Sequence, residues 1–60
     1  MSPKVLCVSH TDRSTIGFYT DMHDGKQWWM LNIDGKWTPA TVNKDDAWKR
    51  YCTAVKRSME

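Results

Sequence analysis

The stretch QWWMLNI at residues 27–33 decides the fold of this chain. It holds two of the four tryptophans, and an Asp-Gly pair stands on each side of it, at residues 24–25 and 34–35. Asp-Gly between apolar runs is typical of a two-residue β-hairpin turn. We therefore predict that residues 27–33 form a strand shared by two hairpins, in the middle of a small antiparallel sheet.

The length of the first turn determines which side chains face the core. A two-residue turn pairs Phe18 with Leu31, whereas a three-residue turn with a glycine bulge shifts the pairing and mixes the two faces. With two residues, one face carries Ile16, Phe18, Met22, Trp29, Leu31 and Ile33, and the other carries Tyr19, Asp21, His23, Trp28, Met30 and Asn32. Trp37 joins this outer face if the second turn also has two residues, and joins the core if that turn is bulged.

The remaining elements follow from periodicity and caps. We predict one domain, residues 1–60, with strands at about 4–10, 15–22, 27–33 and 36–38 and a helix at about 44–58. Asn43 is a favourable N-cap, and Trp48, Tyr51, Cys52, Val55 and Met59 recur at helical spacing. Asp45 with Lys49 and Asp46 with Arg50 are i,i+4 pairs. The predicted class is α+β, a three- to four-stranded antiparallel sheet with the C-terminal helix packed on one face.

Composition limits the setting in which the protein works. The chain has a net charge of +2 and two cysteines. It shows no secretory signal pattern and no run of roughly 18 apolar residues that would span a membrane. We expect a cytoplasmic protein whose thiols are reduced and which does not contact a membrane. Its mild positive charge permits an acidic partner.

Catalytic and metal sites are not favoured by the sequence. The gap between Cys7 and His10 suits a chelate that His23 and Cys52 could complete, but in a strand Cys7 and His10 point to opposite faces. The paired spacings of structural zinc modules are missing. Ser9 and His10 are neighbours without the convergence that a triad requires. We expect no metal, no cofactor and no enzymatic activity.

Two surfaces are candidates for binding. The outer sheet face gathers aromatic and methionine side chains, which are enriched at interfaces, and the helix exposes cations that can meet phosphates or acidic protein surfaces. The predicted partner-binding residues are Tyr19, Trp28, Met30, Trp37, Lys49, Arg50, Lys56 and Arg57. A homodimer could also bury the outer face.

Residues 15–57 carry a likeness to a known family in three short segments. They are Gly25-Lys26-Gln27-Trp28, Gly35-Lys36-Trp37 and Asp45-Asp46-Ala47-Trp48. The region resembles the three-stranded sheet plus helix of AP2-type and integrase arm-binding DNA domains, which implies DNA reading by the sheet. Such domains use a sheet rich in Arg and Lys, whereas here phosphate contacts would depend on Lys26, Lys36 and Arg13.

The leading hypothesis is a stand-alone inhibitor or adaptor that binds another protein through the aromatic side chains of the outer sheet face. The chain is similar in scale to anti-CRISPR proteins and other host-takeover inhibitors of phages and mobile elements. The expected partner is a host protein or nucleoprotein complex in the host cytoplasm. The alternative is a small DNA-binding protein of the AP2 or integrase arm type.

Overall fold

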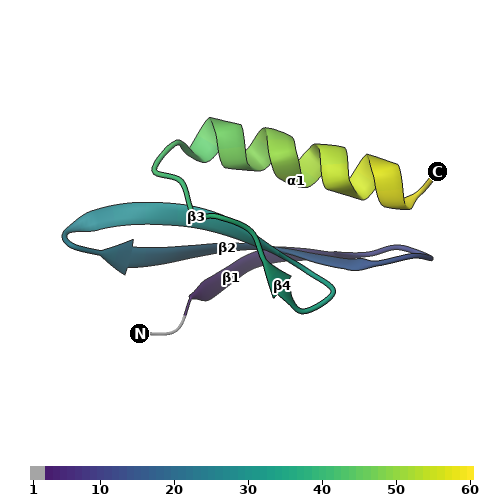
Figure 1. The fold of residues 1–60 in the computed structure, drawn as a ribbon, viewed down its shortest axis with the longest axis horizontal. Coiled ribbons are helices and arrows are strands. Elements are labelled where there is room, and N and C mark those ends of the chain that lie inside the picture. The colour runs from purple at the N-terminus through teal and green to yellow at the C-terminus, as the bar shows by residue number, and fades with distance from the viewer. Residues whose placement is uncertain (1–2) are drawn as a thin grey trace.

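The computed structural model describes residues 3–60 and shows a four-stranded antiparallel sheet with one helix lying across one face (Figure 1). The elements are β1 (Lys4–His10), β2 (Thr15–His23), β3 (Lys26–Ile33), β4 (Lys36–Trp37) and α1 (Lys44–Ser58), and the strands lie in sequence order. The predicted α+β class is confirmed. Residues 1 and 2 of the predicted domain lie outside the described residues.

The turn between β2 and β3 has two residues, Asp24 and Gly25, with φ of 52° and 72°. Two successive left-handed residues match the right-handed twist of a hairpin, and Asp-Gly adopts that conformation readily. Phe18 lies opposite Leu31 and Met22 opposite Gln27, so the predicted register is confirmed. The faces of β2 and β3 follow from it.

The turn between β3 and β4 is built in the same way, from Asp34 and Gly35 with φ of 52° and 88°. Trp37 therefore lies opposite Asn32, on the sheet face away from the helix. The Asp34 carboxylate accepts a hydrogen bond from the Thr15 N–H at 2.9 Å. That bond lowers the pKa of Asp34 below its ordinary 3.8, and a hydrogen bond with the Ser14 side chain makes a smaller contribution in the same direction.

Beyond β4 the chain keeps following β3 for a few residues. Thr38 donates its N–H to the Leu31 carbonyl at 2.9 Å, and Thr41 exchanges two backbone hydrogen bonds with Trp29. Residues 39 and 40 thus both lie between these two pairings, where β3 has one residue. This arrangement is a β-bulge. Residue 39 is proline, which has no N–H to donate.

A second bulge interrupts β1. Val5 lies opposite Tyr19 and Cys7 opposite Phe18, so Leu6 is an extra residue in the ladder. Side chains on either side of a bulge lose strict alternation. Val5 consequently lies on the outer face, while Cys7 and Ser9 lie on the helix side.

The core lies between the helix and the centre of the sheet. Its buried members are Ile16, Phe18, Leu31, Ala47 and Tyr51. The Phe18 ring lies 5.3 Å from the Trp48 ring and 5.6 Å from the Tyr51 ring, between centroids. Met22 was predicted for the core but is 51% exposed, because the β2–β3 hairpin extends past the start of the helix (Figure 1).

The predicted helix stripe was partly wrong about which residues are buried. Ala47, Tyr51 and Ser58 are the buried positions. Trp48 is 45% exposed, and Met59 is 66% exposed because it follows the last helical turn. The contact face is formed by the buried Ala47, Tyr51 and Ser58, with Cys52 and Val55 partly buried beside them.

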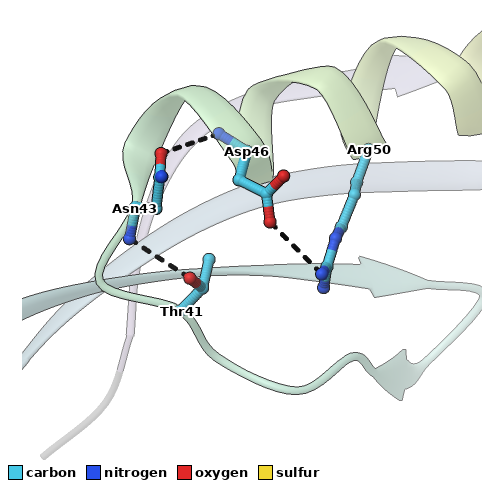
Figure 2. Close-up of polar contacts among 4 residues, drawn as sticks. All are labelled: Thr41, Asn43, Asp46 and Arg50. Carbon is cyan, nitrogen blue, oxygen red and sulfur yellow. Dashed lines mark hydrogen bonds and ion pairs between the residues drawn. The ribbon is translucent and has the colours of Figure 1, made fainter.

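The helix begins with a side-chain cap (Figure 2). The Asp46 N–H donates to Asn43 Oδ1 at 3.0 Å, and the Asn43 N–H donates to Thr41 Oγ1 at 3.1 Å. Arg50 pairs with the Asp46 carboxylate at 3.3 Å, as predicted. Within residues 3–60, the predicted pair of Asp45 and Lys49 does not form.

We predict that Asn43→Ala lowers the free energy of unfolding by about 1 kcal/mol, because an orphan N–H of the first turn loses its acceptor. Denaturant unfolding followed by circular dichroism measures the change. Asn43→Ser, which keeps an acceptor oxygen, should lose only a few tenths of that value. Equal losses in the two variants would contradict a capping role.

Candidate binding surfaces

The predicted partner-binding residues fall into two groups on opposite sides of the molecule. Four belong to the outer sheet face: Tyr19, Trp28, Met30 and Trp37. The other four lie on the helix: Lys49, Arg50, Lys56 and Arg57. The helix covers the other face of the sheet (Figure 1). A flat partner surface therefore cannot touch both groups at once.

The outer face exposes more apolar surface than the sequence predicted. Val5 and Val8 of β1 lie opposite Tyr19 and Gly17, which places both on this side, and both are exposed. Strict alternation would have separated two residues that are three positions apart; the bulge at Leu6 brings them together. We use the name aromatic face for the set Val5, Val8, Tyr19, Trp28 and Trp37.

The centre of the aromatic face is a pair of rings. Tyr19 of β2 and Trp37 of β4 meet edge to face, with centroids 4.8 Å apart and planes at 70°. Since β3 lies between these strands, the rings meet above it. Met30 of β3 is directly opposite Tyr19 and is only 9% exposed. Met30 was predicted as a contact residue, but it is buried beside these rings.

A glycine sets the position of the Tyr19 ring. A β-carbon at Gly17 would stand 2.5 Å from Cε1 of Tyr19, so the ring occupies the space that a side chain would fill. Aromatic cover of a strand glycine is a known way of stabilising a sheet. Gly17 is buried under the ring.

Trp28 forms the end of the aromatic face near the β2–β3 turn. It is half-buried, and its Nε1–H donates to the His23 carbonyl at 3.3 Å. Together with Asp21, Met30 and Ala40 it lines a shallow hollow of about 370 Å³. The indole is thus held in place while part of its ring stays accessible.

The helix side is polar and cationic. Arg50 and Arg57 lie along one flank of α1, beside a groove that also receives Arg13 from the loop between β1 and β2. Lys56 does not line this groove. The sequence assigned Arg13 only to the DNA alternative, because nothing in the linear order relates it to the helix.

A titratable cluster lies beneath the helix. The buried Tyr51 hydroxyl is hydrogen-bonded to the Ser9 hydroxyl, and Cys7 and Cys52 are its half-buried neighbours. Burial raises the pKa of Tyr51, the bond with Ser9 lowers it, and the two thiols raise it further, so that it ends above its ordinary 10.0.

Metal ligands do not gather in the described part of the chain. Among residues 3–60, no three His, Cys, Asp or Glu side chains stand close enough together to hold a metal ion. Cys7 lies on the helix side of β1, whereas His10 lies opposite Thr15 at the end of the strand and on the outer face. The same residues contain no helix that is long and apolar enough to cross a membrane.

Comparison with known proteins yields no relative of this chain. No protein-family model, curated protein sequence or solved structure matches it.

Gly17→Ala should displace the Tyr19 ring without unfolding the chain, because alanine suits a strand backbone and only the movable ring stands in its way. The measurement is two-dimensional NMR of the ring protons. We expect the contacts between Tyr19 and Trp37 to weaken or vanish while the amide spectrum stays dispersed. Persistence of those contacts would show that the glycine does not set the ring's position.

The pKa of Tyr51 predicts a loss of stability in alkali. A raised folded-state pKa means that the fold favours the neutral phenol, so its contribution is present below pH 10 and is lost as pH rises above it. Denaturant unfolding at increasing alkaline pH should show a steeper fall for the wild type than for Tyr51→Phe. Parallel curves would mean that Tyr51 ionisation does not couple to folding.

Proposed function

We propose that this protein is a non-catalytic binding protein that docks on another protein through the aromatic face. One observation carries the proposal. Large apolar side chains from all four strands gather on the side of the sheet that the helix leaves uncovered, with Trp37 at 52% exposed. Apolar patches of this kind on small proteins mark interaction sites, and Trp and Tyr supply most hot spots.

The charges on this face favour protein over DNA as the partner. Lys26 of the β2–β3 hairpin places a positive charge on this face, and the negative charge of Asp21 on the same face offsets it. Lys36 lies opposite Ile33 and therefore on the helix side, and Arg13 lies in the loop between β1 and β2. The three cations that sheet-based DNA reading would require do not share a surface, and phosphate contacts are what position a protein on DNA.

The packing of the ring pair also supports a docking role. Tyr19 packs over Gly17 and against Trp37. A ring that is already ordered loses little conformational entropy when a partner covers it. An ordered aromatic pair at the centre of a patch, with Val5 and Val8 at its margin, is the arrangement expected of a hot spot.

A finer role follows from the uncovered apolar face. A domain with one such face is suited to blocking or bridging a partner. We place it with inhibitors and adaptors of the kind produced by phages and mobile elements, such as anti-CRISPR proteins, acting on a host protein or nucleoprotein complex in the cytoplasm.

Trp37→Ala tests the proposal. Loss of a central indole should weaken partner binding by at least about 30-fold, or roughly 2 kcal/mol. The fold should lose only the edge contact with Tyr19, worth about 0.5–1.5 kcal/mol. The measurement is affinity capture from host lysate followed by titration of the captured protein, with light scattering to record the oligomeric state.

Met59→Ala is the matched control, since Met59 is exposed at the end of the helix, away from the aromatic face. It should capture the partner as the wild type does. Equal capture by Trp37→Ala would refute the proposal. So would a wild-type homodimer that Trp37→Ala converts to monomer, because the face would then serve self-association.

A further inference from the structure

An open groove runs along the flank of α1 above the end of the sheet. Its volume is about 630 Å³. Arg13 enters it from the loop between β1 and β2, while Arg50 and Arg57 enter from the helix, and Ile33 forms part of its apolar floor. The groove lies on the helix side of the sheet and shares no residue with the aromatic face.

The groove carries an excess of positive charge. Four cations line it, the three arginines and Lys49, against one carboxylate, Asp46, which leaves a formal excess of three. Asp46 is already paired with Arg50 at 3.3 Å, and Figure 2 shows the Arg50 side chain directed from the helix toward the sheet. Among residues 3–60, neither Arg13 nor Arg57 has a carboxylate within ion-pair distance.

Unpaired guanidinium groups that share a concavity repel one another until an anion neutralises them. Guanidinium is planar and offers a fork of donors that matches phosphate oxygens two at a time. The groove is therefore complementary to an anion that is held from two sides at once.

The length of the groove favours a chain of anions over a single ion. Its helical lining runs from Asp46 to Ser58, and twelve steps at about 1.5 Å each give roughly 18 Å. Positively charged grooves commonly follow the backbone of single-stranded nucleic acid. A folded acidic protein presents carboxylates on a convex surface, which fits a groove less well.

We propose that this groove binds the phosphodiester backbone of a single nucleic-acid strand, held by Arg13 on one side and by Arg50 and Arg57 on the other. The site is independent of the aromatic face. A protein partner and a nucleic-acid strand can then be held on opposite sides of the sheet, as suits the surface of a nucleoprotein complex.

The test is fluorescence anisotropy with a short labelled single-stranded oligodeoxynucleotide and the intact protein. Arg13→Gln and Arg57→Gln should each weaken binding by about tenfold, as expected for loss of a charge-assisted contact. Each should also reduce the salt slope by about 0.7. Lys56→Gln removes the same charge from the same last helical turn, outside the groove, and should weaken binding less than about twofold.

Several results would overturn the site. Equal losses of affinity in Lys56→Gln and Arg57→Gln would show that the binding depends on general electrostatics. An unchanged affinity in Arg13→Gln would show that Arg13 does not contact the bound strand. Equally tight binding of labelled poly-glutamate, or no binding of the oligonucleotide at low salt, would also refute it. Thermal melts of each variant verify the fold. Trp37→Ala should leave oligonucleotide affinity unchanged, which separates this test from that of the aromatic face.

Discussion

The two-residue turn at Asp24 and Gly25 is the constraint on which the remaining structure depends. Side chains alternate along a strand, so a slip of one residue between β2 and β3 would turn one strand over relative to the other and mix the two faces. With Phe18 kept in the core, Leu31 would then face solvent and Trp28 would face the helix. The left-handed conformations of both turn residues prevent that slip. Division of the sheet into a core face and an aromatic face follows from this turn.

The arrangement of helix and sheet explains why one face stays apolar and exposed. A domain of this size buries a limited share of its surface, and within residues 3–60 one helix covers one side of the sheet. The Phe18, Trp48 and Tyr51 rings fix the helix to that side. No second layer from residues 3–60 covers the rings on the other side. They shield each other instead, through the contact of Tyr19 with Trp37 and the burial of Met30.

The same arrangement separates two kinds of surface. One side of the sheet is aromatic with few charges, and the other carries a groove that gathers arginines from the helix and from the loop between β1 and β2. Apolar contact supplies affinity with little dependence on salt, whereas guanidinium contacts with phosphate depend strongly on salt. The sheet lies between the two surfaces, so the proposed ligand of one would not displace the proposed ligand of the other.

The sequence by itself determined the elements, the register of the central hairpin and the cap at Asn43, because Asp-Gly turns, strand alternation and helix caps act within a few residues. It also indicated that Tyr19, Trp28 and Trp37 could share a face. Only the tertiary structure decided the rest. The bulge at Leu6 moved Val5 beside Val8, since the extra residue depends on how β1 pairs with β2. Arg13 and Arg57 line one groove because the C-terminal end of the helix lies over the end of the sheet that carries the loop between β1 and β2 (Figure 1). The central strand at residues 27–33 thus determined the two faces of the sheet, while long-range packing determined which side chains reach the surface.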